Sequence, residues 1–253
     1  MSENGSAGTL LLGARFNGPV RSANGGFTAG SLAERVPGAD GRAVEVTLRR
    51  PPPLETVLQV ADSEGTTVLL DGESVVAEAV LADRALDAVA EVPPGQAAEA
   101  MQRYPGLRNH PFPTCFSCGP DRAEGDGLRI FPGPVDPTVR SLVASTWVPH
   151  ESHAEIGDVV DGVHRCGVAT TWAALDCVGG WSEDLEGRPC VLGRMAARLD
   201  ALPVVGEPHV VVGRHLGGEG RRSFTASTLY DSDGRIVATA RHTWVQVDPS
   251  RFN

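Results

Sequence analysis

The sequence predicts an α+β fold built from two copies of one unit. Three observations support this prediction: an order of strand, helix and several strands that occurs twice, a hairpin signal at the same place in each copy, and a proline- and glycine-rich stretch between the copies. The copies cover residues 1–91 and 138–253, and residues 92–137 form a linker and insert. A repeat of roughly 110 residues has the size of a duplicated domain rather than of a solenoid unit.

The first copy begins with an apolar run that predicts a strand over residues 9–16. A helix is predicted over residues 28–36, because Ser22 and Asn24 are candidate N-caps and Pro37-Gly38 is a stop signal. Three further stretches with strand character follow, at residues 42–49, 55–61 and 66–83. The order of the first copy is therefore one strand, one helix and a run of strands.

The second copy repeats this order. A helix is predicted over residues 167–178, and Gly179-Gly180 is expected to end it. One strand is predicted before this helix and four after it, at residues 141–148, 191–202, 209–216, 223–230 and 235–247. The intervening residues 92–137 contain one helical patch, at 96–104.

The last hairpins of the two copies can be aligned directly. Asp71-Gly72 and Asp233-Gly234 are both typical of a tight β-turn. Residues 71–79 match residues 233–240, with one residue fewer in the second copy. This match supports the interpretation of the chain as a tandem duplication.

Composition excludes several classes of protein. The net charge of −10 argues against nucleic acid as a partner, because a phosphate backbone needs a basic face. No apolar stretch approaches the length of a membrane span, and the start of the sequence lacks the basic region of a signal peptide. Five cysteines, an odd number, do not indicate a disulfide framework, and we therefore expect a cytoplasmic protein. Three of them, Cys166, Cys177 and Cys190, show no metal-ligand spacing.

Motifs in both copies resemble the double-hotdog acyl-CoA thioesterases. The helix opening of the first copy, NGGFTAGSLA, resembles the glycine-rich helix opening of that family's first half. Asp176 stands where those enzymes carry an aspartate on the second helix, and residues 233–242 resemble their last hairpin. The resemblance implies a double hotdog, in which each of two tandem repeats is a long helix wrapped by an antiparallel sheet.

The resemblance also implies a catalytic site. In the family, an aspartate on the second helix acts with a threonine and a glutamine on neighbouring strands to position a water against the thioester carbonyl. Asp176 matches the aspartate, whereas the glutamine position falls on His242 and the threonine position falls near Gly193 or Arg194. This sequence therefore departs from the family pattern at two of three positions.

His242 and Asp176 are also candidates on the residues alone. Ala238, Ala240 and His242 share one face of the last strand, and the small alanines indicate that the helix lies on this face. A histidine there is either a buried group bonded to a backbone carbonyl or a general base near neutral pH. Asp176, at the edge of the apolar helix stripe, is either a solvated or capping residue or a buried carboxylate that needs a partner. We therefore hypothesise an Asp176–His242 dyad that activates a water.

The Asn24-Gly25-Gly26 opening offers backbone N–H groups at a helix start, with no Cβ to block a ligand. Such groups suit a thioester oxyanion or a phosphate. The alternative is a tight strand-to-helix turn, a common role of glycine pairs. Glu34, further along the same helix, is a candidate for a second site in the first copy.

Cys115 and Cys118 form a single C-x-x-C pair, with His110 ahead of it. A structural zinc site needs four ligands, and His150 or His153 would have to complete this one because no second C-x-x-C follows. We predict no metal and no cofactor, and name His110, Cys115 and Cys118 as metal candidates only. A redox pair and ordinary buried or loop cysteines are the alternatives.

The predicted activity is hydrolysis of an acyl-CoA, or of another acyl or aryl thioester, by water attack. One alternative is a non-catalytic acyl-CoA or lipid-binding protein on the same scaffold. Others are a hotdog hydratase or dehydratase, and an interaction module stabilised by a metal at the C-x-x-C segment. The expected partner is a small thioester, and pairing of two chains into a homodimer of double hotdogs is left open.

Overall fold

The structure is a computed structural model that describes residues 6–83, 85–160 and 162–251. Its first part contains β1 (Ser6–Leu11), α1 (Gly25–Ala33), β2 (Val44–Leu48), β3 (Val57–Ser63), β4 (Thr66–Asp71) and β5 (Ser74–Leu81). The middle contains α2 (Pro94–Met101) and β6 (Gly133–Asp136). The last part contains β7 (Val139–Trp147), β8 (Ala154–Val160), β9 (Val163–Cys166), α3 (Val168–Trp181), β10 (Cys190–Leu199), β11 (His209–Glu219), β12 (Arg222–Tyr230) and β13 (Ile236–Gln246). Short 3₁₀ turns complete the described elements, at Ala14–Phe16, Pro105–Leu107, Glu151–His153 and Pro249–Arg251.

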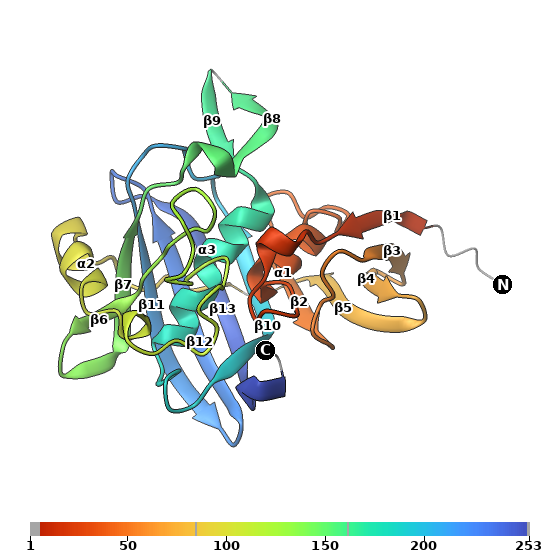
Figure 1. The fold of residues 1–253 in the computed structure, drawn as a ribbon. Coiled ribbons are helices and arrows are strands. Elements are labelled where there is room, and N and C mark those ends of the chain that lie inside the picture. Colours follow the sequence, from red (N-terminus) through yellow and green to blue (C-terminus); the bar gives the residue numbers. More distant parts are fainter. Residues whose placement is uncertain (1–5, 84, 161, 252–253) are drawn as a thin grey trace.

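Within the described residues, eleven strands form one antiparallel sheet in the order β1-β3-β4-β5-β2-β10-β13-β12-β11-β7-β6. The two parts of the chain meet where β2 pairs with β10, from Arg194 opposite Thr47 to Ala197 opposite Val44. Outward from this junction, one half of the sheet runs β2, β5, β4, β3 and β1, and the other half runs β10, β13, β12, β11 and β7. In both halves, the first strand after the helix lies at the junction, the fourth, third and second follow in that order, and then comes a strand that precedes the helix. The fold is therefore α+β with a large antiparallel sheet, as predicted, and it is shown in Figure 1.

The helices α1 and α3 lie against each other on the sheet (Figure 1). α1 packs on β2, β4, β5 and β10, whereas α3 packs on β7 and on β10 to β13. Glycines allow the two helices to approach closely, because a Cβ at Gly30 would lie 2.7 Å from the Ala169 Cα. The same holds for Gly26, where a Cβ would lie 2.8 Å from the Trp172 carbonyl oxygen. The start of α1 is thereby held against the middle of α3.

The insert covers the other face of the second half of the sheet. Val210 and Val212 pack with Ala97 and Ala100 of α2, while Val211 between them belongs to the main core. Successive valines are therefore buried on both faces of β11, which explains its continuous apolar run. The insert also supplies β6, which pairs with β7 at the sheet edge and was not predicted from the sequence.

Most predicted elements are present within a few residues of their expected bounds. Both Asp-Gly hairpins are confirmed: Gly72 and Gly234 have φ of 58° and 75°, which glycine adopts readily. The predicted first strand is shorter, because residues 14–16 form a 3₁₀ turn. The β8–β9 hairpin was not expected.

The prediction that Gly179-Gly180 ends the second helix is wrong, since α3 continues to Trp181. A Cβ at Gly179 would lie 2.5 Å from Thr225 Oγ1 and 2.7 Å from His242 Nδ1. The glycine is therefore needed for close packing of the helix on the sheet rather than for termination. No helix in the described part of the chain has the length and apolarity that a membrane crossing requires.

Candidate functional site

A cavity of about 320 Å³ lies at the start of α1. The segment before α1, the end of β2, the insert around the C-x-x-C pair, α3 and β10 all contribute to its wall. Three residues that the sequence singled out, Asn24, Gly25 and Asp176, line it. The structure thus brings the glycine-rich helix opening and the helix aspartate to one place.

Asp176 is buried in the cavity wall, with 2% of its surface exposed. Its Oδ2 accepts hydrogen bonds from the Gly26 N–H at 2.9 Å and from the Asn24 side-chain amide at 3.0 Å. Its Oδ1 has no hydrogen-bond partner among the described residues. Burial raises the pKa of Asp176 to about 7. The hydrogen bonds from Gly26 and Asn24 favour the ionised form and offset part of this rise. One carboxylate oxygen is thus fixed and the other is available.

The start of α1 is organised around Asn24. Its side-chain oxygen accepts from the Phe27 N–H at 2.8 Å, so Asn24, and not the other candidate Ser22, is the N-cap of the helix. The Gly26 N–H is not free for a ligand as expected, because it donates to Asp176. The Gly25 N–H has no partner in the described chain, and Gly25 lines the cavity. Of the two expected backbone donors, only the Gly25 N–H is therefore without a partner in the described chain.

His242 lies apart from this cavity. Its Nδ1 is 3.1 Å from Thr225 Oγ1, and its Nε2 has no partner among the described residues. Thr225 Oγ1 also accepts from the Trp244 indole N–H at 3.0 Å. Burial lowers the pKa of His242 to about 3, so that the ring is neutral at physiological pH.

The hydrogen bond expected between Asp176 and His242 is not formed. Asp176 Oδ2 is held by α1, His242 Nδ1 is held by Thr225, and the remaining Oδ1 and Nε2 have no partner in the described chain. The two side chains do not meet because they lie on different sides of α3. Asp176 packs against Gly26 of α1, whereas the His242 ring packs against Gly179 on the sheet side.

Glu34 lies at the C-terminal end of α1 and lines a separate cavity of about 510 Å³. This second cavity contains none of Asn24, Gly25 and Asp176. The residue stays a prediction for a second site.

Three cysteines gather on the wall of the first cavity. The Sγ atoms of Cys115, Cys118 and Cys177 all lie within 4.8 Å of one another, and those of Cys115 and Cys177 are 3.6 Å apart. The sequence does not indicate Cys177 as a member of this group, because it has no metal-ligand spacing, and only its place beside Asp176 on the helix could have indicated it. Neither His150 nor His153 belongs to this group of side chains.

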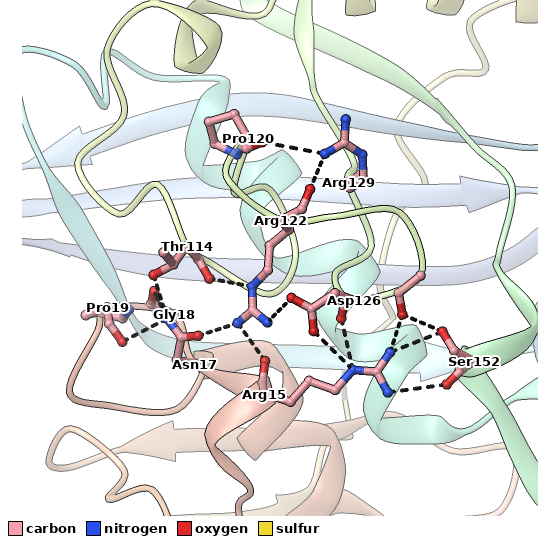
Figure 2. Close-up of polar contacts among 11 residues, drawn as sticks. Arg15, Asn17, Gly18, Pro19, Thr114, Pro120, Arg122, Asp126, Arg129 and Ser152 are labelled. Atoms are coloured by element: carbon pink, nitrogen blue, oxygen red, sulfur yellow. Dashed lines mark hydrogen bonds and ion pairs between the residues drawn. The ribbon is translucent and has the colours of Figure 1, made fainter.

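An arginine network anchors the segment that carries the C-x-x-C pair (Figure 2). Arg122, 8% exposed, donates to the carbonyl oxygens of Thr114 at 2.8 Å and Arg15 at 2.7 Å, and to the Asn17 side chain. Its other terminal nitrogen binds the Asp126 carboxylate at 2.8 Å. These contacts connect the insert to the segment that precedes α1, and so position two sides of the cavity wall.

Comparison with known proteins supports the fold assignment. The tesB protein of Mycobacterium avium subs paratuberculosis is 12% identical, with a TM-score of 0.59, and the match covers 97% of this chain and 96% of that one. A candidate thioesterase from Novosphingobium aromaticivorans is also 12% identical, with a TM-score of 0.63 and 95% of each chain covered. A protein of unknown function with a hot dog fold from Alicyclobacillus acidocaldarius is 13% identical, with a TM-score of 0.53, covering 95% of this chain and 93% of that one.

No family model and no curated protein matches the sequence. The structural neighbours show that the chain has the hotdog fold found in thioesterases, which confirms the resemblance drawn from the sequence at the level of the fold. Because their identities are low, the chemistry must be argued from the cavity itself.

Proposed function

We propose that the chain is a double hotdog that hydrolyses an acyl or aryl thioester in the cavity at the start of α1. The mirrored strand order on either side of the β2–β10 junction supports a tandem duplication of residues 1–91 and 138–253, with 92–137 as the insert. The main support for the activity is Asp176, a buried carboxylate that lines the cavity beside a helix N-terminus and whose Oδ1 has no partner among the described residues.

In this proposal, Asp176 is the general base. Its Oδ2 is held by Gly26 and Asn24, so that Oδ1 is positioned to take a proton from a water in the cavity. The water oxygen adds to the thioester carbonyl, and the negative oxygen that forms accepts from the Gly25 N–H at the positive end of α1. Collapse of the tetrahedral intermediate breaks the C–S bond, and the leaving thiolate recovers the proton from Asp176. The products are a carboxylic acid and a free thiol.

The cavity wall fits an acyl or aryl group joined to a charged carrier. Phe112, Leu192 and Trp244 are buried apolar residues of the wall. Arg49 and Arg50 also line the cavity and are exposed, which suits the phosphates of coenzyme A. Arg49 is paired with Glu78, so Arg50 offers the freer guanidinium, with one 3.2 Å contact to Ser74. We place this activity in the cytoplasm, where the five unpaired cysteines would stay reduced.

A panel of acyl-CoA thioesters tests the proposal. We expect release of free thiol above the uncatalysed rate for at least one member, with loss of that activity in Asp176→Asn. Tight binding of acyl-CoA without any thiol release would instead establish a binding protein on the hotdog scaffold. This second function is favoured by one observation: the threonine and glutamine positions that the resemblance implies fall near Gly193 or Arg194 and on His242. Absence of both binding and hydrolysis would contradict the proposal.

A further inference from the structure

The cysteines on the cavity wall have the geometry of a metal site. We infer that Cys115, Cys118 and Cys177 bind one Zn²⁺ ion as thiolates. Zinc binds cysteine sulfur at about 2.3 Å, and a tetrahedral arrangement therefore places two sulfurs about 3.8 Å apart. The 3.6 Å between Cys115 and Cys177, and the 4.8 Å limit on all three pairs, are close to this spacing. Small side-chain rotations would bring all three sulfurs to one ion.

N–H groups lie beside two of the three sulfurs, those of Cys115 and Cys118. The Trp181 indole N–H donates to Cys118 Sγ at 3.5 Å, and the Asn24 amide donates to Cys115 Sγ at 3.7 Å. His110 Nε2 lies 3.3 Å from Cys118 Sγ. N–H donors around metal-bound sulfur are the usual outer-shell partners that offset its negative charge. Cys115 and Cys118 are also buried, at 4% and 2% exposed, which shields such a site from bulk water.

His110 serves in this site as a hydrogen-bond donor rather than as a ligand. The Phe112 backbone N–H donates to His110 Nδ1 at 2.9 Å, so Nδ1 is the acceptor nitrogen of the neutral ring. Nε2 then carries the proton and donates it toward Cys118. The fourth coordination position is left to a ligand from the cavity, such as water, because all three cysteines and Asp176 border the same cavity.

Binding converts three thiols into thiolates and releases three protons, which leaves the ion and its sulfurs with a net charge of −1. Cys115 and Cys118 belong to the insert, whereas Cys177 belongs to α3, so the ion would join these two segments beside Asp176. This inference does not depend on thioesterase activity, and it revises the sequence-based prediction of no metal.

Metal analysis of the full chain tests the inference directly. The chain is stripped with a chelator under reducing conditions and titrated with Zn²⁺ or with Co²⁺ as a spectroscopic probe. We expect about one ion per chain and a thiolate-to-cobalt charge-transfer band. Cys115→Ser, Cys118→Ser and Cys177→Ser should each lose the band, whereas Cys166→Ser should keep it. Cys166 is the matched control because it is fully buried but lies outside the cluster.

Three results would overturn the inference. The first is no uptake of Zn²⁺ or Co²⁺ by the folded wild-type chain, monitored by circular dichroism so that unfolding is not mistaken for lack of a site. The second is equal loss of binding in Cys166→Ser. The third is a Cys115–Cys118 or Cys115–Cys177 disulfide found by mass spectrometry in the chain as purified. His110→Ala tests whether the histidine is a donor or a ligand. Retained metal binding supports three thiolate ligands with an open fourth position, and lost binding overturns the assignment of His110 as a hydrogen-bond donor.

Discussion

Asp176 on α3 and His242 on the neighbouring β13 are both buried polar residues, yet the structure gives them different surroundings. Asp176 borders a cavity, has two N–H donors on one oxygen and keeps the other oxygen available. His242 lies between α3 and the sheet, where Thr225 is its one side-chain hydrogen-bond partner among the described residues. Burial raises the pKa of the first group toward neutrality and lowers that of the second far below it.

This difference separates a residue that can act on a ligand from one that packs in a core. A general base needs both a route to the substrate and a proton affinity near the working pH. Asp176 meets the first requirement through the cavity. His242 does not line it, and protonation of its ring would place an unpaired charge in the core. The predictions below test this contrast, beginning with the largest expected effect.

Asp176→Asn should lower kcat/KM for a hydrolysed thioester by about 10²–10⁴-fold, the usual contribution of a general base. The variant keeps the shape of the side chain and can still accept from the Gly26 N–H. The matched variant is His242→Gln, which retains a polar partner for Thr225 and should leave kcat/KM near the wild-type value. Steady-state assays of both variants, with thermal melts to check folding, measure the contrast. Equal losses of kcat/KM in the two variants would contradict the distinction between Asp176 and His242.

Arg122→Met should lower the free energy of unfolding by about 3 kcal/mol, because it leaves the carbonyl oxygens of Thr114 and Arg15 without this donor and removes the ion pair with Asp126. Arg140→Met is the control, since Arg140 makes ion pairs from an exposed position. Urea denaturation gives both values. A loss in Arg122→Met no larger than in the control would show that the network of Figure 2 does not stabilise the cavity wall.

Gly26→Ala should destabilise the fold by up to about 3 kcal/mol, because the added Cβ would lie 2.5 Å from the Asp176 Cβ and 2.8 Å from the Trp172 carbonyl oxygen. The matched control is Gly95→Ala in α2, where a Cβ meets nothing within 4 Å. That substitution should stabilise the chain slightly, since alanine favours the helix. Thermal unfolding distinguishes the two, and similar midpoints would argue against the close contact of α1 with α3.

His242 should make the fold less stable as the pH falls. Its folded pKa of about 3 lies below the unfolded value, so the unfolded state binds a proton first and stability is lost on acidification from about pH 6.5. The loss from this residue between pH 7 and pH 5 should be about 2 kcal/mol. Urea denaturation at both pH values should show a smaller decrease in His242→Leu than in the wild type. An unchanged pH dependence would mean that His242 is accessible to protons in the native state.

Much of the fold could be predicted from the sequence, because periodicity and turn residues are local signals. The Asp-Gly hairpins, the Asn24 cap and the run of strands after each helix all follow from such signals. Gly179-Gly180 misled the prediction, since a helix stop and a close contact both select glycine. Only tertiary packing distinguishes the two.

The candidate site was predicted in part. Asn24, Gly25 and Asp176, three residues that the sequence singles out, meet at one cavity. The alternation of side chains along a strand correctly predicted that His242 faces the helix. It does not predict which turn of α3 the histidine meets, and that turn carries Gly179 rather than Asp176. Cys177 has no local spacing to Cys115, so only the folded chain brings the two sulfurs together.

The most direct test of the central claim is a crystal structure with a non-hydrolysable thioether analogue of a bound acyl-CoA. The account predicts the thioether sulfur in the cavity at the start of α1, within reach of the Gly25 N–H and of Asp176 Oδ1, with the phosphates near Arg50. Density for the analogue in the cavity beside Glu34, or against His242, would contradict it.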